Sequence, residues 1–395
     1  RFFKKYFRNM IKAHYPTEKF QHIQTPFYYY DLDVLRQTLS EIKALDLPEN
    51  YAVHYAMKAN VNPKILAVIK DAGFGADCVS GGEIRAALAA GFPASKIVFA
   101  GVGKADWEIN LALESDIFCF NAESVPELEV INELAAAMNK KARIALRINP
   151  NVSAHTHEYI TTGLNENKFG INMEDLDKVT DLMPTLQNLD FIGIHFHIGS
   201  QITDMTAFHN LCVRIEEIQD IFETKNIRIA HINVGGGLGI NYEHPNHFPV
   251  PEFEIFFKTY RDHLILKPDQ TLHFELGRSI VAQCGSLISR VLYVKEGSTR
   301  KFVILDAGFT DLIRPALYQA YHRIENLSSD STIQKYDVVG PICESSDVFA
   351  KDFALNETQR GDLIAIRSAG AYGEIMASQY NLRKLPEAIT SDDLN

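Results

Sequence analysis

The chain has 395 residues, of which 46% are hydrophobic and 23% charged, a composition typical of a soluble globular protein too long for one ordinary core. Its formal net charge of −11 argues against a nucleic acid or an anionic membrane as partner, because both would repel the average surface. We therefore expect two domains, and a local anion pocket stays possible inside an acidic protein.

The cysteines and the N-terminus bear on the compartment. There are five cysteines, an odd number without a CxxC pair, which is typical of free thiols in a reducing cytoplasm. The basic start RFFKKYFRNMIK lacks the apolar core of a signal peptide, and no apolar run approaches the length of a membrane span. Because the first residue is not Met, a trimmed start or a lost leader stays open. We expect a cytoplasmic protein. The cysteines are Cys78, Cys119, Cys212, Cys284 and Cys343.

From about residue 30 to 275, short β-branched runs alternate with amphipathic stretches. Such alternation predicts βαβ units around a parallel sheet. Eight units over about 250 residues match a closed (β/α)8 or TIM barrel, and no linker interrupts the series. The expected strands are 51–57, 75–79, 96–101, 116–121, 143–149, 191–199, 229–237 and 271–277. The expected helices include PKILAVIKDAG, GEIRAALAAG, SVPELEVINELAAAM and the run from Asp204 to Phe222.

After about residue 277 the pattern changes to strand-like runs joined by polar turns, which predicts a mainly β domain of the sandwich or barrel kind. The segment TPFYYYD at 25–31 is also strand-like and is expected to add a strand to that domain. We therefore predict a barrel over 31–275 and a discontinuous β domain over 1–30 and 276–395.

The unusual short strings of the barrel all follow expected strands. Lys58 follows the first strand and DCVSGGE the second, while HFHIGSQ, GGGLG and ELGR follow the sixth, seventh and eighth. In such barrels functional residues lie at the C-terminal ends of the strands. Unrelated surface features would scatter over both ends, so this clustering predicts an active site.

Three of these strings suggest a chemistry, each beside a simpler alternative. A lysine at a barrel mouth is partly desolvated, which lowers its pKa and frees the amine of Lys58 to attack a carbonyl; the alternative is a solvated lysine. Consecutive glycines let backbone N–H groups approach an anion, or they simply make a tight turn. Glu275 can keep a pyridine nitrogen protonated and Arg278 can grip a carboxylate or phosphate, unless the two form a surface salt bridge.

Paired histidines offer a rival interpretation. His195 and His197 stand two apart on an expected strand, so both would face one side, and His155 and His157 repeat the spacing. Same-face histidines inside a barrel can bind a metal. The neighbouring strand ends offer Lys58 and Glu275 rather than further ligands, and His197 is equally explained as a ring stacked on a flat cofactor. We expect no metal.

Three strings of the second domain are too polar for an ordinary core. Arg314 and Tyr318 stand four apart and share a face if their segment is helical. Cys343 precedes Glu344, and a thiol beside a carboxylate suits proton donation better than nucleophilic attack; the alternative is a buried small hydrophobic residue. Tyr372 is a candidate hydrogen-bond donor to a phosphate.

These strings together resemble the alanine-racemase-like (fold type III) pyridoxal-phosphate decarboxylases, and among them the members that act on diaminopimelate. The resemblance runs from about residue 25 to 385. Its one departure is Leu276 in ELGR, where the family usually has Pro, and this touches only a turn residue. The matching strings are AMKAN, DCVSGGE, NPNVSAHTHEYITTG, NKFGI, HFHIGSQ, NVGGGLGI, ELGRSIV, DAGFTDLIRPALY, CESSDVFA and GAYGEIMASQYNLR.

The resemblance implies a set of roles. Lys58 would attach pyridoxal 5′-phosphate covalently, His197 would stack on its ring, and Glu275 would pair with the pyridine nitrogen. Cys343, supplied by the second subunit of a homodimer, would protonate the α-carbon. The remaining cofactor-binding residues would be Asp77, Ser200, Gly235, Gly236, Gly237, Gly277, Arg278 and Tyr372. The substrate-binding residues would be Arg278, Arg314, Tyr318, Glu344 and Tyr372.

The implied reaction is the decarboxylation of meso-diaminopimelate to lysine. That substrate keeps a carboxylate and an ammonium at its far end, which arginine and glutamate side chains can bind. Ornithine and arginine decarboxylases of this fold have no far carboxylate to bind and typically carry Asp where Glu344 stands. Carboxynorspermidine decarboxylation is the runner-up, followed by a non-enzymatic relative of the same fold and by a metal hydrolase on the same barrel.

Overall fold

The computed structural model describes residues 14–152 and 168–394. The chain divides into two compact units, which we call the barrel unit (Glu41–Gly239 and Glu252–Gly277) and the β-rich unit (Arg1–Ser40, Ile240–Pro251 and Arg278–Asn395). The basic N-terminal segment and the pair His155 and His157 lie outside the described residues. Within the described ranges, no helix combines the length and apolar character needed to span a bilayer.

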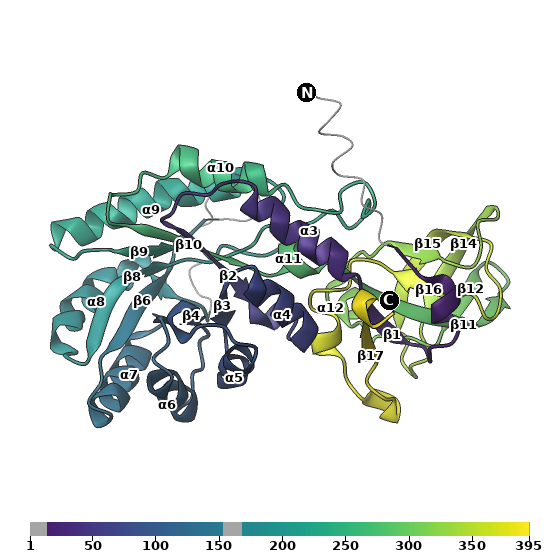
Figure 1. Cartoon of the computed structure of the whole chain (residues 1–395), viewed down its shortest axis with the longest axis horizontal. Coiled ribbons are helices and arrows are strands. Elements are labelled where there is room, and N and C mark those ends of the chain that lie inside the picture. Colours follow the sequence, from purple (N-terminus) through teal and green to yellow (C-terminus); the bar gives the residue numbers. More distant parts are fainter. Residues whose placement is uncertain (1–13, 153–167, 395) are drawn as a thin grey trace. The chain divides into compact units, whose positions relative to one another are not determined.

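The barrel unit contains a closed parallel barrel, which confirms the predicted (β/α)8 class (Figure 1). The strand order is β5-β4-β3-β2-β10-β9-β8-β6, and pairing of β5 with β6 closes the ring. A short strand, β7 (Ile171–Asn172), pairs with β6 outside the ring. The barrel strands are β2 (Tyr51–Ala56), β3 (Gly75–Cys78), β4 (Ile97–Phe99), β5 (Cys119–Ala122), β6 (Ala142–Asn149), β8 (Leu189–His195), β9 (His231–Asn233) and β10 (Thr271–Leu276).

Helices surround the barrel strands in the places where amphipathic stretches were expected (Figure 1). Local capping explains where two of them begin, because the side chains of Ser80 and Ser124 accept the backbone N–H of Glu83 and Glu127, respectively. The helices are α4 (Pro63–Asp71), α5 (Gly81–Ala89), α6 (Asp106–Glu114), α7 (Val125–Ala137), α8 (Leu176–Leu182), α9 (Thr206–Thr224) and α10 (Phe253–His263). Helix α3 (Leu32–Lys43) belongs mostly to the β-rich unit. Short 3-10 turns are η1 (Met57–Ala59), η2 (Ala94–Lys96), η3 (Met173–Asp175) and η4 (Met183–Thr185).

The β-rich unit contains an eight-stranded sheet, as its sequence pattern predicted. The expected N-terminal strand is β1, which pairs antiparallel with β11 and parallel with β17. The strands are β1 (Phe27–Tyr30), β11 (Gly285–Glu296), β12 (Lys301–Leu305), β13 (Ile324–Asn326), β14 (Ile333–Val339), β15 (Val348–Asn356), β16 (Leu363–Ile366) and β17 (Glu387–Thr390). The short helices are α2 (Thr17–Phe20), α11 (Arg278–Val281), α12 (Arg314–Tyr318), η5 (Glu374–Met376), η6 (Tyr380–Leu382) and η7 (Ser391–Asp393).

Strand β1 is central in this sheet and all four of its residues are buried. Burial on both faces explains why its sequence, FYYY, is a continuous aromatic run rather than an alternating one. The Phe20 ring packs edge-on against Phe27 and Tyr29, with ring centroids 5.2 and 4.9 Å apart. Such edge-to-face pairs add to the stabilisation from apolar burial, so this cluster ties the N-terminal strand to the core of the unit.

Candidate active site

Glu275, near the end of β10, is the centre of a buried hydrogen-bond group inside the barrel unit. Its Oε1 accepts the side-chain amides of Asn233 at 2.8 Å and Asn121 at 3.3 Å. Its Oε2 lies 3.0 Å from Nε2 of His195, at the end of β8. All four side chains are buried, and they come from four different strands. Closure of the barrel therefore brings three hydrogen-bond donors, each neutral or cationic, to the carboxylate of Glu275.

These partners determine the charge of Glu275. Burial alone would raise the pKa of its carboxyl, but the attraction and hydrogen bond of His195, helped by His54 and His197, outweigh burial and lower the pKa to about 2. The side chain is therefore an anion at neutral pH. An ionised carboxylate fixed by three donors is the group needed to hold a proton on a pyridine nitrogen.

His197 differs from the sequence prediction in one respect. Strand β8 ends at His195, so His197 lies in the following loop, and the expectation that the two share one strand face is wrong. The strand stops because the backbone turns towards the glycine loop, where Gly236 N–H approaches Nδ1 of His197 at 3.5 Å. Burial, followed by the charges of Lys58 and Arg147, lowers the pKa of His197 to about 3. A neutral imidazole suits stacking on a flat ring.

Lys58 lies in η1, directly after β2, between buried Met57 and Ala59. The residue itself is exposed, so the expected partial desolvation is wrong for the chain alone. The charge of Lys58 nevertheless acts on two site groups, lowering the pKa values of His197 and Asp77. It is thus close enough to both to share one site within the barrel unit.

Asp77, on β3, is almost fully buried and carries an unsatisfied atom. Within the described residues its Oδ1 has no hydrogen-bond partner. Burial and the neighbouring Glu275 raise the pKa of this carboxyl well above its usual range, although Lys58 and Arg147 oppose the shift. A buried polar atom without a partner is costly unless something else satisfies it, so Asp77 marks a place for a polar ligand.

The glycines of GGGLG have a packing role as well as a candidate binding role. A Cβ on Gly235 would meet the carbonyl oxygen of Phe196 at 2.2 Å, and one on Gly236 would meet that of Glu275 at 2.0 Å. Gly235 also has a positive φ of 69°, which favours glycine. The backbone therefore needs glycine to lie against the ends of β8 and β10. The N–H of Gly235 donates to Oδ1 of Asn233, so the loop is fixed by the same asparagine that holds Glu275.

In the β-rich unit, Arg278 and Arg314 gather around one tyrosine. The hydroxyl of Tyr242 accepts Nη1 of Arg278 at 2.5 Å and Nη2 of Arg314 at 3.4 Å. The Cζ of Arg314 lies 5.9 Å from the Tyr318 ring centre, which confirms that α12 presents the two residues on one face. The Cζ of Arg278 lies 5.0 Å from the ring of Tyr372. Two buried guanidinium groups with aromatic walls form a site suited to an anion.

Cys343 and Glu344 lie in an exposed loop of the β-rich unit, so the alternative of a buried small hydrophobic cysteine is wrong. The loop is held by two contacts from η6. The amide of Asn381 accepts Cys343 N–H at 2.9 Å, and Tyr380 donates its hydroxyl to Glu344 at 2.7 Å. Ser200 is also exposed, directly after the loop that carries His197, whereas Gly277 is buried at the end of β10.

Several members of this arrangement were not predicted. His195 was considered only as a metal ligand, and the roles of Asn121, Asn233 and Tyr242 were missed. His195, Asn121 and Asn233 are each a polar residue within a run that otherwise has the pattern of a buried strand. This mismatch is the sequence signal that could have identified them. The part of the chain covered by residues 14–152 and 168–394 holds no group of three or more His, Cys, Asp or Glu residues arranged to bind a metal.

Comparison with known proteins fits this geometry. Residues 33–282 match the family model described as "Pyridoxal-dependent decarboxylase, pyridoxal binding domain". The chain belongs to this decarboxylase family. It is 66% identical to diaminopimelate decarboxylase of Bacteroides thetaiotaomicron over 97% of this chain and 100% of that protein. It is similar to the crystal structure of the Helicobacter pylori diaminopimelate decarboxylase complexed with L-lysine, with a TM-score of 0.87, 42% identity, and coverage of 95% and 94% of the two chains.

The residues of this decarboxylase fit pyridoxal 5′-phosphate. An anionic Glu275 can face the pyridine nitrogen, the neutral His197 ring can lie against the cofactor, and exposed Lys58 offers an amine for its aldehyde. The unsatisfied Oδ1 of Asp77 offers a further polar contact. The barrel unit therefore carries the charge pattern that the family's cofactor requires.

Proposed function

We propose that this enzyme decarboxylates meso-2,6-diaminopimelate to L-lysine and CO2, the last step of lysine biosynthesis. The observation that carries the proposal is the 66% identity to a diaminopimelate decarboxylase along the whole of that relative. This similarity favours diaminopimelate over carboxynorspermidine or another basic amino acid as substrate.

The β-rich unit supplies groups that suit the far end of such a substrate. We assign its far carboxylate to Arg278, Arg314 and Tyr318, because two buried guanidinium groups converge on one tyrosine hydroxyl there. We assign the far ammonium to Glu344, whose exposed carboxylate can accept it. Tyr372 contributes at the substrate and at the phosphate of the cofactor.

The remaining assignments concern the cofactor and the reacting atoms. When bound, pyridoxal phosphate supplies the electron sink that takes up the charge left as CO2 departs. Lys58 would hold the cofactor through its side-chain amine. The anionic Glu275 would favour a proton on the ring nitrogen, and the neutral His197 would lie against one face of the ring and exclude water there. The phosphate is assigned to the main chain or hydroxyls of Ser200, Gly235, Gly236, Gly237 and Gly277, with Arg278, and Asp77 lies beside the cofactor.

The thiol of Cys343 is assigned the proton that is delivered to the α-carbon. We propose a homodimer in which each subunit completes the other's site, and the exposure of Cys343 and Glu344 on their own chain supports this proposal. We further propose a cytoplasmic enzyme, because five unpaired thiols suit a reducing compartment, and a cofactor-binding domain over 31–275 flanked by a discontinuous β domain.

The test is incubation of the purified chain with pyridoxal phosphate and meso-diaminopimelate, with carboxynorspermidine in parallel. Release of CO2 and lysine from the first substrate alone is the expected result. Borohydride treatment should remove the cofactor's absorbance near the visible edge and add the cofactor's mass at Lys58. Turnover of carboxynorspermidine but not diaminopimelate would overturn the substrate assignment, and an absent absorbance band after reconstitution would overturn the role of Lys58.

A further inference from the structure

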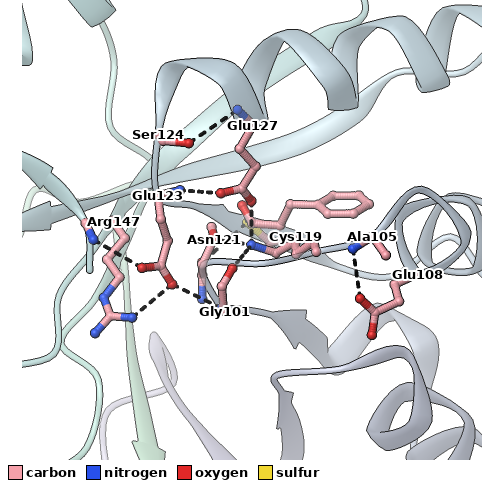
Figure 2. Close-up of polar contacts among 12 residues, drawn as sticks. Gly101, Ala105, Glu108, Cys119, Asn121, Glu123, Ser124, Glu127 and Arg147 are labelled. Carbon is pink, nitrogen blue, oxygen red and sulfur yellow. Dashed lines mark hydrogen bonds and ion pairs between the residues drawn. The ribbon is translucent and has the colours of Figure 1, made fainter. Parts of the chain in front are cut away.

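A second buried charge group lies at the C-terminal ends of β4, β5 and β6 in the barrel unit (Figure 2). It consists of two ion pairs, Arg147 with Glu123 and Lys104 with Glu127. The side chains of Glu123 and Lys104 are only 2% and 1% exposed. Buried charges are retained at a cost in desolvation, so a pair at the mouth of the barrel calls for a functional explanation.

Glu123 accepts hydrogen bonds from three segments of the chain. Its Oε1 takes Nη1 of Arg147 at 2.9 Å and the N–H of Gly101 at 3.1 Å, and its Oε2 takes the N–H of Gly170 at 3.1 Å. Figure 2 shows its carboxylate facing the guanidinium of Arg147. Both oxygens act as acceptors, which a carboxylate can do and a carboxamide cannot, because the NH2 of glutamine would oppose an N–H.

Lys104 and Glu127 hold the backbone segment that carries Glu123. The ammonium of Lys104 donates to the carbonyls of Gly101 and Asn121, at 2.8 and 2.9 Å, and to Oε1 of Glu127 at 2.5 Å. Oε2 of Glu127 accepts the N–H of Glu123 at 2.8 Å. All three ammonium hydrogens are used, so the backbone from Asn121 to Glu123 is firmly set. The same backbone segment carries Asn121, whose side chain donates a hydrogen bond to Glu275.

The register of the sheet directs Arg147 into the barrel. On the adjacent strands β6 and β8, Arg147 is the direct partner of His195. Side chains of directly paired residues project to the same face, and His195 points inwards to Glu275. The guanidinium of Arg147 also lies over the ring of Phe169, with Cζ 4.8 Å from the ring centre. Arg147 thus contacts both a carboxylate and an aromatic ring, and only 12% of its side chain is exposed.

We propose that Glu123 is a positioning residue that holds the guanidinium of Arg147 at the cofactor end of the barrel, as a fixed positive charge beside His197 and Asp77. The charge of Arg147 acts on both side chains, lowering the pKa of each, which supports their proximity. Arg147 offers the cofactor a guanidinium cation in addition to the N–H groups of the glycine loop and the amine of Lys58. Its effect on turnover rests on the proposed decarboxylation, whereas its effect on cofactor binding does not.

The test is a double-mutant cycle with E123Q, R147Q and the double variant, measured on the full-length chain. The first readout is the dissociation constant of pyridoxal phosphate, from absorbance titration of the cofactor-free protein. We expect E123Q and R147Q each to weaken binding roughly tenfold or more, the effect of losing a hydrogen bond to a charged group. Because Glu123 acts through Arg147, the double variant should bind no more weakly than R147Q.

The second readout is steady-state turnover of meso-diaminopimelate. E123Q should lower kcat about ten- to hundredfold, as expected for a small displacement at the reacting centre, and leave KM nearly unchanged. The control is D116N, which removes the exposed ion pair of Asp116 with Arg143, on β6 as well, and should alter neither readout. If the wild type binds cofactor but makes no lysine, the proposed function is wrong. The dissociation constants of the double-mutant cycle would still test whether Glu123 positions Arg147.

Additive losses in the double variant would overturn the inference, as would E123Q with wild-type cofactor affinity and kcat. If E123Q does not fold, F169L carries the test, since Phe169 is 41% exposed and its replacement leaves the buried charges intact. Loss of the ring over the guanidinium should weaken cofactor binding about two- to tenfold. Unchanged affinity in F169L would then overturn the inference.

Discussion

The barrel mouth buries its polar side chains, whereas the Cys343 loop exposes its polar side chains. In the barrel, Glu275 is buried and accepts three side-chain donors from three other strands. In the loop, Cys343 and Glu344 are exposed and are held mainly by Asn381 and Tyr380. One chain therefore sets the charge of the barrel site by itself, whereas the exposed pair is left open to a further molecule. Substitutions on each side can test this difference.

The largest effect is expected from K58A. The variant lacks the amine that we assign to attachment of the cofactor. We expect activity to fall by at least about 10⁴-fold, which equals the largest effect typical of losing a general acid or base. The absorbance band that borohydride removes should also be lost. The exposed Lys64 on α4 provides the control K64A, which should keep the band and the activity. A visible band that survives in K58A would contradict the assignment.

E275Q comes next. The variant keeps the shape but loses the negative charge that we assign to the ring nitrogen, so kcat should fall about 10²–10³-fold, the range for removal of one preorganised electrostatic group. Cofactor content should stay near that of the wild type. Steady-state kinetics and absorbance measure the two quantities, and a wild-type kcat in E275Q would show that the charge of this carboxylate does not contribute to turnover.

The same carboxylate predicts a pH dependence of stability. Its pKa is lowered in the folded chain from 4.5 to about 2, so its stabilising contribution is complete above pH 4.5 and is lost as the pH falls towards 2. The shift corresponds to about 3 kcal/mol of unfolding free energy. Urea midpoints between pH 5 and 3 should fall less steeply in E275Q than in the wild type or in E129Q, a control at an exposed position on α7. Parallel slopes would refute the shift.

R314M should act mainly on substrate binding. If Arg314 binds the far carboxylate as proposed, loss of these charged hydrogen bonds should cost about 1.5–3 kcal/mol and raise KM for meso-diaminopimelate about 10- to 150-fold. R360M is the matched control, because exposed Arg360 also lies over a tyrosine ring, 5.0 Å from the centre of Tyr293. A drop in kcat at constant KM would instead give Arg314 a role at the reacting centre.

The smallest effect is expected from Y242F, which removes the hydroxyl shared by Arg278 and Arg314. An ordinary hydrogen bond contributes about 0.5–1.5 kcal/mol, so KM should rise about two- to tenfold with little change in kcat. The melting temperature serves as the control for folding. Unchanged KM would show that the two guanidinium groups need no common anchor.

The sequence predicted the features that depend on local pattern. The eight barrel strands, the aromatic strand β1 and the helical pairing of Arg314 with Tyr318 all follow from periodicity and spacing. It did not predict which polar residues meet at the barrel mouth. His195, Asn121 and Asn233 come from three strands and meet at Glu275 only after the ring has closed. Nor did it give the end of β8, because the turn after His195 is set by close packing against Gly235.

The central place of β1 in its sheet has a consequence for synthesis of the chain. Phe27 pairs with Ile288 on one side and with Glu387 on the other, so this strand is made long before either partner and finds its second neighbour only after Glu387 has been added. All barrel strands have been made once Leu276 is added, so the barrel can close before either β11 or β17 is available to pair with β1. An unpaired aromatic strand is prone to aggregate, and the nascent chain is therefore vulnerable from the synthesis of β1 until β11 and then β17 have been made.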